Sequence, residues 1–275
     1  MSDSKPIVCR PTRWFLFRAL VMLLMFGVFA VLFFKDGSTG YRKANEVFYL
    51  RKAFDRAASE FEKMNASGSL SPERWKNHAS SQQVEFPGDP GLFPASLKQS
   101  MPWPEILQNH EQMKNLQTGK KLWLEYSKIK GLNAKTVEHP YDASKIAGQW
   151  GAFSFCAFLS VAAAFILLRT MRRSISADGE GITNQQGRKI PYGDLKTLDL
   201  RKWDTKGLAF LDYDGASGKG RIRIDGLTYG GFKEEDGQPA ERLMKVVRSR
   251  ISGEILEYAP ILEQIPPAEE KSADE

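Results

Sequence analysis

The sequence predicts a membrane protein with two transmembrane α-helices, a mainly α extracytoplasmic domain between them and a small antiparallel α+β C-terminal domain. Two apolar runs predict the helices, because each is about as long as a helix that crosses a bilayer. From Ile175 onward, alternation of apolar and polar residues replaces helical spacing, which predicts strands. The expected segments are an N-terminal tail at 1–13, the first helix at 14–34 and the domain between the helices at 35–149. The second helix follows at 150–168, then the C-terminal domain at 169–258 and a tail at 259–275.

The first apolar run contains 14 leucine, valine and phenylalanine residues. On the insertion scale these favour the membrane by roughly 4–8 kcal/mol, and Arg18 opposes this by at most ~3 kcal/mol. A cleaved signal peptide is the alternative, but the run is long for one and no small-x-small cleavage site follows Phe34. We therefore expect an uncleaved anchor with Trp14 and Arg18 at the membrane interface.

The second run, from Trp150 to Leu168, has no charged residue. As a helix it would be roughly 28 Å long, which matches a hydrocarbon core of ~30 Å. The alternative is the core helix of a soluble protein, which the flanking tryptophan and arginines disfavour. The residues predicted to lie at the membrane interface are Trp14, Arg18, Trp150, Arg169, Arg172 and Arg173.

Basic residues predict the orientation. Arg10 and Arg13 precede the first run and Arg18 lies near its start, and Arg169, Arg172 and Arg173 follow the second run. The positive-inside rule then puts both termini in the cytoplasm and residues 35–149 outside. Lys35, Arg42 and Lys43 argue the other way, but long loops translocate largely regardless of charge. The expected location is the plasma (inner) membrane, crossed twice.

Between the two runs, residues 41–64 form the clearest amphipathic helix, with apolar residues at three- and four-residue steps. Since an apolar stripe needs a partner, this helix is expected to pack in a core. A short helix is expected next, with Ser71 as its cap and Pro72 at its first position, followed by an irregular proline-rich connection at 84–105. Further helices are expected at 105–117 and 120–129. The core is expected to contain Trp75, Trp103 and Trp123.

The C-terminal domain is predicted from short alternating runs separated by glycine-rich turns. The strands are expected at both sides of a turn within 181–191, at 195–203, at 208–213 and at 221–225, followed by a helix at 239–252. Ile222 and Ile224 are expected to face inward. Strands joined by short turns favour an antiparallel sheet. The proline-rich, acidic residues 259–275 are expected to be a disordered tail.

The run Asp178-Gly-Glu-Gly-Ile182, followed by Gly187-Arg-Lys-Ile-Pro-Tyr192-Gly-Asp-Leu195, resembles the opening hairpin of bacterial pleckstrin-homology-like (PH-like) domains that follow membrane anchors. The helix at 239–252 also fits that architecture. The resemblance implies a barrel of strands with a closing helix over about 172–258. The whole chain is similar to uncharacterised bacterial two-span proteins, a likeness that implies no activity.

Composition and motifs disfavour several functions. The net charge of +6, from 39 basic and 33 acidic residues, is spread along the chain, whereas a nucleic-acid binder gathers its charge. Cys9 and Cys156 cannot pair across half a membrane, and no paired-cysteine zinc site exists. The turn at 215–220 only superficially resembles a phosphate loop, because Gly220 stands where serine or threonine is needed. No cofactor is expected.

Three functional hypotheses remain open. The first is a non-catalytic scaffold that links the outer domain to the PH-like module, with the lipid bilayer and proteins on one or both sides as partners. The second is an envelope enzyme formed by residues 35–149, which contain the isolated His78, His110 and His139. The third is an accessory subunit of a transporter. An enzyme is the less favoured class, no catalytic, cofactor-binding or metal-binding residue is assigned, and the oligomeric state stays open.

Overall fold

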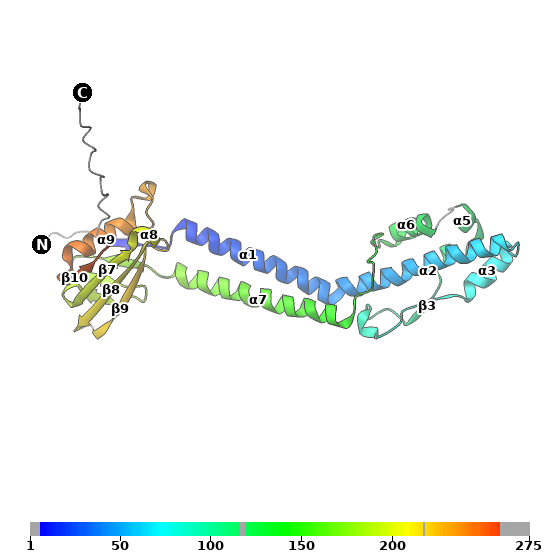
Figure 1. Ribbon diagram of the computed structural model, residues 1–275, viewed down its shortest axis with the longest axis horizontal. Helices are drawn as coiled ribbons and strands as arrows, with labels where there is room; N and C mark the ends of the chain where they lie inside the picture. The colour runs from blue at the N-terminus through cyan, green and yellow to red at the C-terminus, as the bar shows by residue number, and fades with distance from the viewer. Residues whose placement is uncertain (1–5, 116–118, 217, 259–275) are drawn as a thin grey trace, which may run out of the picture. The chain divides into compact units, whose positions relative to one another are not determined.

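The computed structural model describes residues 6–115, 119–216 and 218–258 of the chain (Figure 1). The chain divides into two compact units. The terminal unit comprises residues 1–23 and 161–275, and the central unit comprises residues 24–160. The tail predicted at 259–275 lies outside the described residues.

Two long helices contain the apolar runs. They are α1 (Arg13–Lys35) and α7 (Ala143–Met171). By length and composition, each can cross a membrane. Only 6% of the most apolar window of each helix is buried, whereas the core helix of a soluble protein would be mostly buried. The helices predicted at 14–34 and 150–168 are therefore present, and their apolar side chains face outward.

The first helix continues without a break into the next. A π-helical turn, η1 (Asp36–Gly40), joins α1 to α2 (Tyr41–Ala66). The Tyr41 N–H donates to the first carbonyl of this turn, five residues back, which is the wide spacing of a π-helix. The Arg42 side chain donates to two other carbonyls of the turn and, at 2.9 Å, to that of Gly91. The sequence predicts α2 but does not predict this continuity.

The apolar stripe of α2 forms the centre of the core of the central unit. Phe54 is fully buried, and its ring lies 5.4 Å from that of Trp123 on α6 (Gly119–Lys130), the helix alongside α2 (Figure 1). Trp75 and Trp103 are buried in the same core. The predicted core with three tryptophans is confirmed.

Other elements of the central unit agree with the sequence in part. They are α3 (Pro72–Ser81), β2 (Gln83–Glu85), η2 (Pro90–Leu92), β3 (Ser100–Pro102), α4 (Glu105–Gln108) and α5 (His110–Asn115). Ser71 caps α3 as predicted, since its side chain accepts a hydrogen bond from the Arg74 N–H at 3.2 Å. The helix predicted at 105–117 breaks at Asn109, whose side chain accepts the Gln112 N–H at the start of the second piece. Residues 116–117 lie outside the described chain. The proline-rich connection contains the antiparallel pair β2–β3.

The folded part of the terminal unit contains β-strands and one longer helix. Its elements are β1 (Ile7–Cys9), β4 (Ile175–Ala177), β5 (Gly181–Thr183), β6 (Lys189–Pro191), η3 (Tyr192–Asp194), β7 (Leu195–Lys202), α8 (Trp203–Lys206), β8 (Leu208–Gly215), β9 (Gly218–Asp225), η4 (Glu234–Asp236), α9 (Pro239–Arg250) and β10 (Glu254–Leu256). Within the described residues they form two four-stranded sheets, ordered β1-β4-β5-β6 and β10-β7-β8-β9. Helix α9 packs against β1 and β4.

The strand pairs are antiparallel as predicted, with one exception. The predicted hairpin forms as β5–β6, and Ile222 and Ile224 of β9 are buried. Strand β10, however, pairs with β7 in parallel. It follows α9, so the chain crosses over through a helix before it returns to the sheet, as a parallel pair requires.

The N-terminal segment differs most from the prediction, which treats residues 1–13 as a tail. Strand β1 pairs antiparallel with β4, and Cys9 lies opposite Ile175. Only three residues form this strand, between two prolines, so their sequence shows no recognisable alternation. The N-terminal segment is therefore part of the same sheet as the residues that follow α7.

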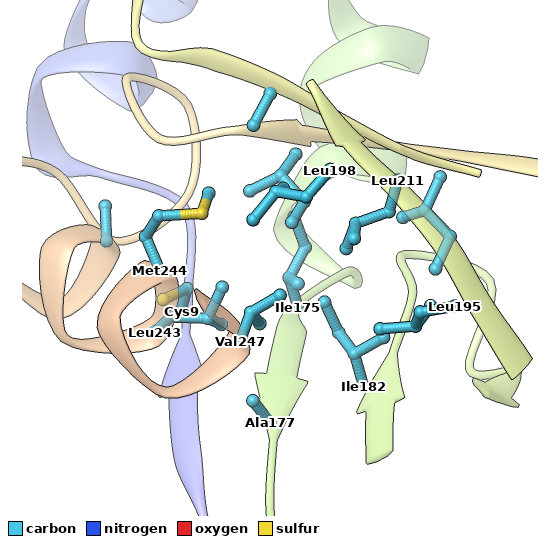
Figure 2. Close-up of a cluster of buried hydrophobic side chains, with 14 of the residues drawn as sticks. Cys9, Ile175, Ala177, Ile182, Leu195, Leu198, Leu211, Leu243, Met244 and Val247 are labelled. Carbon is cyan, nitrogen blue, oxygen red and sulfur yellow. The ribbon is translucent and has the colours of Figure 1, made fainter. Parts of the chain in front are cut away.

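Figure 2 shows the core that β1 completes. Cys9 is 2% exposed and lies in one cluster with Ile175 and with Leu243 and Val247 of α9. Its S–H donates to the Pro239 carbonyl at 3.3 Å. Burial raises the pKa of the Cys9 thiol to about 12, so the side chain stays neutral and packs as an apolar group.

We expect Cys9→Arg to unfold the terminal unit far more readily than Val8→Arg. The first variant puts an unpaired charge into the core and should cost about 3 kcal/mol or more. Val8 is the control, because it lies on the other face of the same strand and is 45% exposed. Thermal unfolding of the two full-length variants in detergent measures the difference. Equal unfolding temperatures would show that β1 does not belong to the core.

Candidate membrane interface

Aromatic side chains gather in the central unit where α1 ends and α7 begins. The Trp150 ring lies 5.5 Å from that of Phe34 and 5.9 Å from that of Phe153. Gly37 permits this approach, because a Cβ there would lie 3.3 Å from the Trp150 indole nitrogen. Trp150 is 38% exposed, so its ring still reaches the surface at this end of α7. Its role at a membrane interface stays a prediction.

A buried asparagine fixes the chain just beyond this cluster. Asn45 on α2 is 1% exposed. Its Nδ2 donates to the carbonyls of Leu92 at 3.0 Å and Tyr141 at 2.9 Å, and its Oδ1 accepts the Tyr141 N–H at 2.7 Å. The Tyr141 ring also stacks on Tyr41, with ring centroids 3.8 Å apart. These contacts tie the loop before α7 to the start of α2.

In the terminal unit, Thr12 connects the start of α1 to the turn after β9. Its side chain accepts the Phe15 N–H at 3.2 Å and so caps α1. The same hydroxyl donates to the Leu227 carbonyl at 2.9 Å, and the Thr12 N–H donates to the Thr228 carbonyl at 2.8 Å. The helix start is therefore held in place by backbone groups of the folded domain.

The predicted interface residues of the terminal unit lie at the ends of α1 and α7. Trp14 is 62% exposed and stacks on Phe17, with ring centroids 6.0 Å apart. Arg169 and Arg173 lie near Tyr229: burial raises the pKa of Tyr229, and the two arginines partly offset this. The remaining predicted residues, Arg18 and Arg172, are exposed. The ion pairs found within the described chain involve other arginines.

A groove of about 740 Å³ lies within the terminal unit, and we call it the junction groove. It is lined by Phe15, Phe17, Arg18, Ala19, Val21 and Met22 of α1, by Ala163 and Ile166 of α7, and by Lys206, Leu208, Arg223, Asp225, Leu227 and Thr228. Apolar side chains form its helical walls. The structure thus brings Arg18 together with Lys206 and Arg223, two cations that the sequence analysis did not single out.

Local structure explains how the two further cations reach the groove. Ile222 and Ile224 of β9 point into the core, so Arg223 between them points outward. Lys206 ends α8, and Gly207 after it has φ 61°, the left-handed conformation that ends a short helix. A side chain at Gly207 would also collide with Phe232, at 2.9 Å. No sequence signal separates these two cations from other exposed ones.

The three histidines do not form one site. His78 contacts Glu60, with Nε2 and Oε2 2.8 Å apart. Although burial raises the pKa of Glu60, hydrogen bonds from His78 and Arg56 lower it below its ordinary value. His110 contacts Glu111, and His139 is exposed. Among the residues that the structure describes, no group of three histidine, cysteine, aspartate or glutamate side chains could hold a metal ion.

We expect Asn45→Leu to lower the free energy of unfolding of the central unit by about 1–3 kcal/mol, because it leaves partly buried backbone groups of Leu92 and Tyr141 without partners. Asn77→Ala, at an exposed position of α3, is the control and should change this energy by less than about 0.5 kcal/mol. Denaturant unfolding of the full chain, followed by tryptophan fluorescence, measures both. Similar midpoints for the two variants would contradict the structural role of Asn45.

Comparison of the chain with protein-family models, with curated proteins and with solved structures gives no match.

Proposed function

We propose that this protein is a non-catalytic scaffold anchored in the bacterial plasma membrane by α1 and α7. The observation that carries the proposal is the pairing of β1 with β4. The two strands flank the pair of apolar helices in the sequence, so the chain leaves one folded domain through α1 and re-enters it through α7. Both apolar helices and the central unit therefore lie, in the sequence, between two paired strands of the terminal unit.

The proposed topology puts the terminal domain in the cytoplasm and the central domain outside. Exposed apolar side chains on both helices support insertion, since water would solvate them poorly. Arginines lie at the start of α1 and at the end of α7, where these helices join the terminal unit, and they support the orientation. Arg42 opposes it by charge, but its guanidinium donates to three backbone carbonyls and so is held within the protein.

For the terminal domain we propose a PH-like module. Two four-stranded sheets with a helix packed on one of them agree with this proposal. Asp178, the first residue of the run that resembles the opening hairpin of PH-like domains, supports this proposal. Its Oδ1 accepts hydrogen bonds from the N–H groups of Glu180 and Gly181, at 2.9 and 3.0 Å, and so stabilises the turn before β5. A hydrogen bond from Lys189 lowers the pKa of Asp178 to about 2, which keeps the carboxylate charged. Strand β1, from before the anchor, would be an addition to the module.

The central domain offers a surface for a protein partner outside the membrane. Leu124 and Ile129 on α6 are 50% and 69% exposed, while Leu122 and Trp123 of the same helix are buried. Helix α6 thus has an apolar face in the core and two more apolar side chains directed away from it. The two side chains are about 140° apart around the helix axis, so we propose them as two separate contact points for another protein.

Labelling of single cysteines tests the topology. We expect Ser67→Cys to react with a membrane-impermeant maleimide on intact spheroplasts, because residue 67 is exposed in the central unit. Gln186→Cys, exposed in the β5–β6 turn, should react only after the membrane is opened. Both variants are made in a chain with Cys9→Ala and Cys156→Ser. Equal labelling of the two positions before opening would contradict the two-span arrangement.

Crosslinking in native membranes, followed by mild detergent purification, tests the scaffold function. We expect the wild-type chain to recover a specific protein, and Leu124→Glu with Ile129→Glu to reduce that recovery at least tenfold, because the charges disrupt an apolar contact. Lys121→Glu with Lys128→Glu, exposed on the same helix, is the control for charge change. Recovery of the bare monomer alone from wild-type membranes would count against a scaffold.

A further inference from the structure

We propose that the junction groove is a binding site for one anionic glycerophospholipid. Its phosphate would lie against Arg18, Lys206 and Arg223, and one acyl chain would lie along the walls formed by α1 and α7. The inference rests on the proposed insertion of both helices in a membrane, and it adds a specific lipid partner to that proposal.

The charges of the groove favour an anionic group. Three cations and one carboxylate line it, so its formal charge is +3 − 1 = +2. The carboxylate, Asp225, is already engaged: it lies 3.1 Å from Arg223 Nη2 and accepts the Thr228 N–H at 3.0 Å. Arg18 and Lys206 have no carboxylate within ion-pair distance among the described residues. A bound phosphate diester would supply the missing negative charge.

The apolar walls select a lipid over a soluble phosphate. Phe15 and Met22 of α1 face the groove together with Ala163 and Ile166 of α7. Leu227 extends this surface on the domain side and is 57% exposed. A free phosphate ion would leave these side chains uncovered, whereas an acyl chain would cover them. One ligand with an anionic head and an apolar tail satisfies both parts of the groove.

The position of Arg18 gives a second reason for a charged ligand. Arg18 lies one turn into α1, inside the apolar run, where an arginine costs up to ~3 kcal/mol unless it is paired or reaches the interface. Charged residues in such helices pair with a partner charge or face a polar cavity. A lipid phosphate at the interface would be such a partner. A second copy of this chain, docked by its apolar helices, would leave Arg18 and Lys206 unpaired.

Hydrogen bonds fix the walls of the groove relative to each other. The hydroxyl of Thr12, which caps α1, donates to Leu227, and the Thr12 backbone pairs with Thr228, so two lining residues are tied to α1. Tyr229 follows them and interacts with Thr170 near the end of α7. The groove is thus formed by parts that are joined to one another, and this favours a ligand of defined shape.

Native mass spectrometry of the full-length protein in detergent tests the proposal. We expect the wild-type chain to retain one phosphatidylglycerol in preference to phosphatidylcholine. Arg18→Gln, Lys206→Gln and Arg223→Gln should each weaken phosphatidylglycerol binding about fivefold, and the triple variant on the order of a hundredfold. The control removes three exposed lysines of the terminal unit outside the groove, with Lys196→Gln, Lys202→Gln and Lys233→Gln. It should bind like wild type.

Three outcomes would overturn the lipid site. In the first, the wild-type chain retains phosphatidylglycerol and phosphatidylcholine equally. In the second, the groove triple variant and the control triple variant lose phosphatidylglycerol to the same extent. In the third, a second copy of the chain displaces the lipid. Circular dichroism checks that the triple variants are folded. Carbonate extraction of the native membranes distinguishes the two proposals: a chain that resists extraction but retains no phosphatidylglycerol is anchored without this site, and a chain that is released is not anchored.

Discussion

The pairing of β1 with β4 is the constraint on which the rest of the structure depends. The chain leaves the sheet at Cys9 and returns to it at Ile175, so both apolar helices and the whole central unit form one insertion between two adjacent strands. The same pairing explains why Cys9 is buried among residues of α9. It also places Thr12 next to the Leu227 turn, and this contact closes one side of the junction groove.

Local patterns made much of the fold predictable. The apolar runs predict α1 and α7, the spacing of apolar residues predicts α2, and glycine-rich turns predict the β5–β6 hairpin. In each case the signal lies within about 20 consecutive residues. The features that the sequence does not predict depend on distant partners: β1 needs β4, β10 needs β7, and the π-turn is held by Arg42 and the Gly91 carbonyl. No local pattern specifies such a partner.

The candidate sites likewise divide into residues with a local sequence signal and residues that only the fold brings together. Arg18 could be singled out because it is a charge in an apolar run. Lys206 and Arg223 could not, since an outward-facing cation on a strand or short helix resembles any solvated residue until the fold puts it beside Arg18. Asn45 gives one weak signal, because it lies four and eight residues before Tyr49 and Ala53, which pack in the core. A polar residue at that spacing needs a buried partner.

The separation of β1 from its partner has a consequence for biosynthesis. Cys9 and Ile175, which lie opposite each other, are 175 − 9 = 166 residues apart. At a synthesis rate of ~5–20 residues per second, the ribosome adds these residues in roughly 8–33 s. During that time the N-terminal strand has no sheet to join, while the central unit can already fold. Closure of this sheet is therefore a late event, which must wait until the residues after α7 have been synthesised.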